Sequence, residues 1–324
     1  MNDPVTDDVA RAERWFLDNG LPYFVAEDHR GVSEALHARR LVAVTGASVL
    51  GAAVAGVLVG VATDDPSLGF LTGLVALGAL AGLYALVALR LAPIAGWAVR
   101  RSFRSLGLLF PLVTRALPLL LLFVTFFFIN TEVWQVASSM DRPLLWTVVL
   151  LFAAVAVVFL LARLPEELDR VGHELEGDRL VDCCADTPLH ETAARLGGEL
   201  EIEPVRGLRR ANLLLLLVIA QAIQVLLLSL AVFAFFAVFG RLAITAEVVE
   251  SWIGRPPGYL GDVTLISTEL FQVSVFLAAF SGLYFTVYAV NDDSYRKQFF
   301  TSVTHELERA LGMLAVYRAL RRAP

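Results

Sequence analysis

Two stretches of the chain carry the same short polar pattern within otherwise apolar sequence. Residues 131–136 read Thr-Glu-Val-Trp-Gln-Val and residues 268–273 read Thr-Glu-Leu-Phe-Gln-Val. Side chains three positions apart share one face of a helix, which brings each Glu beside its Gln. Ionisable groups are costly within apolar spans and usually face an interior or a water-filled cavity. The pattern therefore suggests a ligand-binding site for a cation or proton, formed by Asn130, Glu132, Gln135, Glu269 and Gln272.

A structural interpretation of the same residues competes with this one, and the sequence leaves both open. In it, both Glu side chains lie at the membrane interface, where solvation costs little, and the amides join helices by hydrogen bonds. The repetition would then be a coincidence, because an inverted three-plus-three repeat places matching positions at opposite leaflets.

The elements that must position these side chains are long apolar runs. The 324 residues are 57% hydrophobic, and the mean hydropathy is +0.67. A helix needs about 20 predominantly apolar residues to cross a bilayer. The sequence therefore predicts an all-α fold, a polytopic transmembrane helical bundle of about six spans with short cytoplasmic amphipathic helices. The expected spans are 41–61, 68–89, 116–137, 144–162, 211–240 and 263–290.

The distribution of basic residues predicts the orientation. Cytoplasmic flanks of membrane spans carry an excess of Lys and Arg. With the N-terminus inside, only Arg142, Arg241 and Arg255 fall in outer loops, and every other basic residue lies inside. We therefore expect both termini to be cytoplasmic. Glu132 and Glu269 then lie near the outer leaflet.

Three parts of the chain follow from these spans. Residues 1–40 are expected to form a cytoplasmic helical segment, and residues 41–290 a six-span membrane domain with a cytoplasmic helical loop at 163–210. Residues 291–324 are expected to form a cytoplasmic amphipathic helix. Its apolar stripe would contact a protein partner or a second copy of the chain, or pack on the 163–210 helices. The stripe comprises Phe300, Val303, Leu307, Ala310, Leu314 and Tyr317.

Pairs of glycines four residues apart occur in the first two spans. Small residues at this spacing let two helices approach closely in lipid. The pairs predict a tight hairpin of these two spans. They are Gly56 with Gly60, Gly69 with Gly73, and Gly78 with Gly82.

Several classes of function receive no support. The net charge of −6 gives no case for a nucleic-acid partner. Cys183, Cys184, His173 and His190 match no standard zinc spacing, so no metal site is expected. The chain has no HExxH helix, P-loop or GxSxG elbow. We therefore expect neither an enzyme nor a cofactor.

Two segments carry a resemblance to other proteins. Phe-Phe-Ile-Asn-Thr-Glu-Val-Trp-Gln-Val (127–136) and Ser-Gly-Leu-Tyr-Phe-Thr-Val-Tyr-Ala-Val (281–290) are similar to uncharacterised integral membrane proteins of high-GC actinobacteria. The resemblance implies a bacterial plasma membrane and carries over no activity, ligand or catalytic residue.

Two functional hypotheses follow from the sequence. The first is a channel or transporter for a cation or small polar solute, with an outward-facing acidic site. The alternative is a non-transporting scaffold or assembly factor that docks partners through the 163–210 loop and the C-terminal helix. Only the lipid bilayer is a partner that both hypotheses require.

Overall fold

The computed structural model describes residues 4–104, 121–174, 178–197, 205–260, 263–291 and 293–322. The chain divides into two compact units. Unit 1 comprises residues 1–98, 174–216 and 308–324, and unit 2 comprises residues 99–173 and 217–307. Most of the described residues are helical, and the strands among them form one short β-hairpin, which confirms the predicted all-α class.

Unit 1 begins with short helices and a long helical hairpin. Its own elements are α1 (Pro4–Asp18), η1 (Pro22–Phe24), α2 (Ala26–Ala35), α3 (Ala38–Thr63), α4 (Pro66–Ala88), α9 (Asp178–Asp182) and α10 (His190–Leu196). Four helices contribute residues to both units: α5 (Leu91–Arg104), α8 (Arg142–Glu174), α11 (Leu208–Ala243) and α14 (Asp293–Arg322). Unit 2 adds a helix at Leu121–Phe128, α7 (Thr131–Ser139), α12 (Ala246–Ile253), β1 (Tyr259–Leu260), β2 (Val263–Ser267) and α13 (Thr268–Asn291).

Five described helices are long and apolar enough to cross a membrane, and a bent pair brings the number to six. The five are Ala38–Thr63, Leu68–Ala88, Arg142–Arg170, Leu208–Ala243 and Thr268–Tyr288. These helices identify an integral membrane protein in contact with the lipid bilayer. They confirm the predicted bundle of about six spans.

The third expected span, over 116–137, differs from a single straight helix. The helix Leu121–Phe128 is followed by α7 at a bend of 74°. Asn130 causes the interruption: its backbone is extended, and its side chain accepts a hydrogen bond from the Val133 N–H at 3.2 Å. Asn is a favoured N-cap, so it starts a new helix where the apolar run alone suggests continuity. Residues 116–120 lie outside the described part of the chain.

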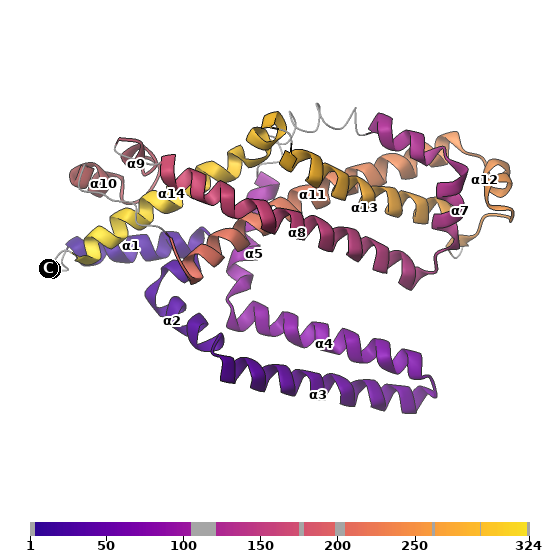
Figure 1. Ribbon diagram of the computed structural model, residues 1–324, viewed down its shortest axis with the longest axis horizontal. Helices are drawn as coiled ribbons and strands as arrows, with labels where there is room; N and C mark the ends of the chain where they lie inside the picture. Colours follow the sequence, from indigo (N-terminus) through magenta and orange to yellow (C-terminus); the bar gives the residue numbers. More distant parts are fainter. Residues whose placement is uncertain are drawn as a thin grey trace. The chain divides into compact units, whose positions relative to one another are not determined.

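The predicted hairpin of the first two spans is confirmed in α3 and α4, which run side by side (Figure 1). A Cβ atom added to Gly56 would lie 2.7 Å from the Gly69 carbonyl oxygen, so any side chain there would push the helices apart. Gly78 and Gly82 take no part in this contact and have open space beside them. A Cβ atom added to Gly51 would lie 3.9 Å from Leu80 Cδ1, an ordinary contact distance.

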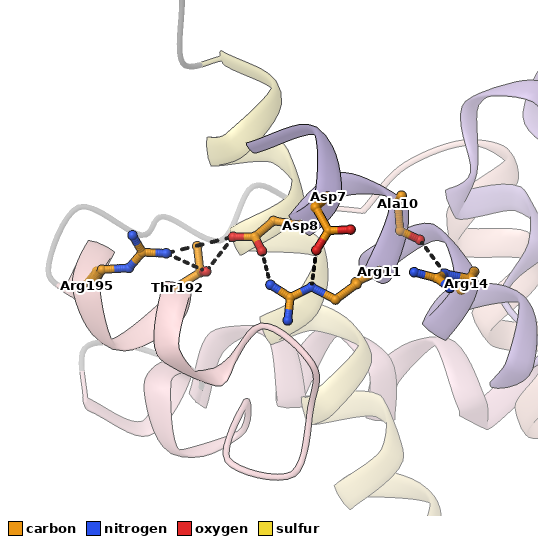
Figure 2. Close-up of polar contacts among 7 residues, drawn as sticks. All are labelled: Asp7, Asp8, Ala10, Arg11, Arg14, Thr192 and Arg195. Atoms are coloured by element: carbon orange, nitrogen blue, oxygen red, sulfur yellow. Dashed lines mark hydrogen bonds and ion pairs between the residues drawn. The ribbon is translucent and has the colours of Figure 1, made fainter. Parts of the chain in front are cut away.

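In unit 1, a buried carboxylate joins α1 to α10 (Figure 2). Asp8 accepts a hydrogen bond from the Thr192 hydroxyl at 2.8 Å and also contacts Arg11 of its own helix. Arg195 Nη2 lies 3.8 Å from the same carboxylate. A buried carboxylate is stable only when such donors surround it. These contacts therefore fix the N-terminal helix on residues 190–196.

The part of α14 that belongs to unit 1, residues 308–322, packs there along the face that the sequence indicated. Leu314 and Tyr317 are buried, and the Tyr317 hydroxyl donates a hydrogen bond to Glu13 of α1 at 2.7 Å. A Cβ atom on Gly312 would lie 3.0 Å from Cys184 Sγ, so α14 also passes close to the segment after α9. Ala310 is buried as well, and so is Leu307, the last residue of unit 2, whereas the side chains of Phe300 and Val303 are outside the described set.

Candidate functional site

The two helices that carry the repeated pattern pack against each other in unit 2. α7 contacts both α13 and α12, and these elements share one end of the unit. We define the cap as residues 244–267, which hold α12 and the β-hairpin. Part of the sixth expected span belongs to this cap, since Val263–Ser267 forms a strand paired with β1. Three of its five residues, Val263, Thr264 and Ile266, are β-branched, which favours a strand, and α13 begins only at Thr268.

Glu269 is buried in the first turn of α13, with 1% of its side chain exposed. Its Oε1 atom lies 3.2 Å from Nη1 of Arg255, whose side chain is 55% exposed. Its Oε2 atom accepts a hydrogen bond from the Gly258 N–H at 3.0 Å. A buried carboxylate needs both a cation and hydrogen-bond donors to offset its lost hydration. Residues of the cap supply both.

Arg255 also ties the cap to α7. Its Nη2 atom donates a hydrogen bond to the carbonyl oxygen of Ser138, in the last turn of α7, at 3.3 Å. One guanidinium therefore joins the end of α7 to the start of α13. Arg suits this position because its planar group presents several donors in fixed directions.

The side chains of the two Gln residues donate hydrogen bonds to different segments. Gln272 is buried and donates from Nε2 to the carbonyl oxygen of Met140 at 2.7 Å. Its Oε1 atom is buried without a hydrogen-bond partner among the described residues. Gln135 is exposed and donates to the carbonyl oxygen of Trp252, in α12, at 3.0 Å. Both amides thus join segments far apart in the sequence.

The remaining two predicted residues lie at the start of α7. Asn130 is its N-cap, and Glu132 is an exposed residue of its first turn. A carboxylate at that position interacts favourably with the positive end of the helix dipole. Glu269 and Gln272 therefore form the buried part of the set, whereas Glu132 and Gln135 are open to the surroundings. Binding of a cation by this set stays a prediction.

Sequence reasoning missed Arg255 and Gly258, which complete the environment of Glu269. Two signals were available. Arg255 is one of only three arginines placed outside, and Pro256-Pro257-Gly258 is a typical turn sequence directly after it. A turn there brings Arg255 back toward the next helix. Its pairing with Glu269 is the simplest way to neutralise a carboxylate at the start of a span.

Among the residues that the structure describes, no group of three or more His, Cys, Asp or Glu side chains is placed to hold a metal ion. Comparison with known proteins adds no assignment: no protein-family model, curated protein or solved structure matches this chain.

Proposed function

We propose that this integral membrane protein is a channel or transporter for a cation or small polar solute. The observation that supports the proposal is the interrupted third span packed against α13, where Glu269 is buried and, among the residues that the structure describes, is paired only with the half-exposed Arg255. Interrupted helices at membrane depth are tolerated where they are buried in protein or line a cavity, and many transporters bind their substrates at them. Ionisable groups in such places commonly belong to a substrate or ion pathway.

In this proposal the Arg255–Glu269 pair is a gate at the outer end of unit 2. Arg255 neutralises the carboxylate in the closed state, and its half-exposed guanidinium is rehydrated when it moves away. A cation or an ammonium group would then take its place at Glu269, while the Gly258 N–H keeps the carboxylate oriented. The unpartnered Oε1 of Gln272 supplies a further acceptor. Glu132, exposed on α7, attracts cations to this end.

The orientation in this proposal follows the arginine distribution. It places the cap outside a bacterial plasma membrane and both termini in the cytoplasm. The proposal includes no enzymatic reaction, no cofactor and no nucleic acid.

The test is flux in proteoliposomes that contain the purified protein. Na⁺, K⁺ and proton movement are followed with ion-sensitive dyes, and solute movement with radiolabelled small polar solutes. We expect flux by the wild type and at least a tenfold loss in the Glu132→Gln, Glu269→Gln double variant, because both carboxylates are then neutral. Glu250→Gln is the matched control, since Glu250 is an exposed carboxylate of α12. Equal flux in a correctly folded double variant would remove these residues from the mechanism.

A second candidate function is a non-transporting scaffold that docks partners through the 163–210 loop and the C-terminal helix. The large apolar side chains that α3 and α4 expose, including Val61 and Phe70, do not distinguish the two functions, because membrane-spanning helices expose such side chains to lipid. The part of the C-terminal stripe that belongs to unit 1, from Ala310 to Tyr317, is buried there, which leaves less of it for a partner. A scaffold predicts a partner that co-purifies after crosslinking and is lost when residues 294–324 are removed. A preparation with the chain alone would count against it.

A further inference from the structure

A polar cavity of about 460 Å³ lies within unit 2, at the end that carries the cap. Its walls come from the last turn of α11, the first turn of α12, the β-hairpin and Trp134 of α7. Pro257 and Leu270 also line it, and they are the sequence neighbours of Gly258 and Glu269. Glu269 itself is not among the residues that line the cavity. Small-molecule sites commonly measure about 300–1,000 Å³, so the volume suits a small solute.

Two opposite charges line this cavity without neutralising each other. Arg241 belongs to the last turn of α11, and Glu247 to the first turn of α12. Among the described residues, neither side chain takes part in an ion pair. A hydrogen bond from the Thr245 side chain lowers the pKa of Glu247, so its carboxylate is ionised at neutral pH. Arginine is charged at every physiological pH.

The rest of the lining combines hydroxyl groups with an apolar wall. Thr245, Tyr259 and Ser267 contribute hydroxyl groups, and Val249 and Leu270 contribute aliphatic surface. A solute that fits this lining has a polar, doubly charged part and tolerates an apolar substituent.

We propose that the cavity binds a small zwitterion with one carboxylate and one ammonium group, the chemistry of a free amino acid. The carboxylate would lie at Arg241 and the ammonium group at Glu247. A solute with a single charge would meet one attractive and one repulsive group, which favours the zwitterion over singly charged analogues. The inference rests on the proposed function and names its solute class.

The test is calorimetric binding to the purified full chain in detergent, where no gradient or flux is needed. The probes are glycine, alanine and leucine. Each is compared with its amide, which lacks the carboxylate, and with the matching carboxylic acid, which lacks the ammonium group. We expect at least one free amino acid to bind at least tenfold more tightly than both of its analogues. Arg241→Gln and Glu247→Gln should each weaken that binding at least tenfold.

Two controls and one rescue make the result decisive. Arg142→Gln and Glu250→Gln remove exposed charges that do not line the cavity, and should leave binding unchanged. The charge exchange Arg241→Glu with Glu247→Arg should bind more tightly than either reversal alone, because the cavity again offers both charges. The inference is overturned if no free amino acid binds, if the analogues bind equally well, or if the cavity variants match the controls.

The outcome is separable from that of the flux experiment. Amino acids that bind in detergent without any flux would retain the cavity as a binding site and remove the transport function. Ion flux without amino-acid binding would retain transport and overturn the zwitterion assignment.

Discussion

At the level of single residues, the two partners of the Glu269–Arg255 pair differ in what they lose when separated. Glu269 is 1% exposed and Arg255 is 55% exposed. A buried carboxylate without its cation keeps most of its desolvation cost, whereas a half-exposed guanidinium is rehydrated. We expect Arg255→Gln to lower the free energy of unfolding by about 1–3 kcal/mol, less than for a fully buried pair. Glu269→Gln should cost less.

Thermal unfolding in detergent measures this difference. The double variant Arg255→Gln, Glu269→Gln should be more stable than Arg255→Gln alone, because no buried charge then lacks a partner. A double variant that is less stable than both single variants would contradict the claim that Arg255 stabilises the fold by neutralising the buried carboxylate of Glu269.

The adjacent cysteines should differ in reactivity. Burial, with a smaller contribution from the neighbouring Cys183, raises the pKa of Cys184 to about 11. At pH 8 only about one thousandth of this thiol is the reactive thiolate. Cys183 is partly exposed. We expect a maleimide to modify Cys183 at least ten times faster, as measured by mass spectrometry of the Cys183→Ser and Cys184→Ser variants. Equal rates would contradict the burial of Cys184.

At the level of elements, the α3–α4 contact depends on two glycines. An added Cβ would lie 2.7 Å from backbone at Gly56 and 2.6 Å from backbone at Gly69. Backbone cannot move aside as a flexible side chain can, so Gly56→Ala and Gly69→Ala should each cost about 1–3 kcal/mol. Gly78→Ala is the matched control, because a Cβ atom added to Gly78 would meet no neighbouring atom within 4 Å. Unfolding midpoints in detergent measure the effect, and equal midpoints for Gly56→Ala and Gly78→Ala would exclude a tight hairpin.

The sequence predicted the elements that depend only on nearby residues. Spans follow from uncharged length, and the α3–α4 hairpin follows from glycine spacing. The interruption at Asn130 was missed because a hydropathy average over about 20 residues hides one capping side chain. The helix of the fourth span continues through Pro165 to Glu174, since packing can hold a helix together past a proline. The cap was missed because its strands are short.

In the candidate site, too, contacts between residues distant in the sequence could not be predicted. Its five residues could be named from the sequence, but their partners could not. Gln135 and Trp252 are 117 residues apart, as are Ser138 and Arg255. Such pairings depend on how the cap folds back over α7, and one sequence carries no direct record of that.

At the level of the whole molecule, the predicted orientation is open to a direct test. In a cysteine-free background, Ser251→Cys places a thiol on the cap and Glu34→Cys places one on α2, both at exposed positions. We expect a membrane-impermeant maleimide to label Ser251→Cys in intact cells. Glu34→Cys should be labelled only after permeabilisation. The reverse pattern would overturn the orientation, and with it the access of solutes from outside through the cap.

The most direct test of the gate compares flux through the two halves of the ion pair. In proteoliposomes, Arg255→Gln should raise flux above wild type, because Glu269 then lacks its competing cation. Glu269→Gln should reduce flux at least tenfold. Arg142→Gln, an exposed arginine at the start of α8, should behave as wild type. If Arg255→Gln and Glu269→Gln change flux in the same direction, the pair is a structural tie and the gate does not exist.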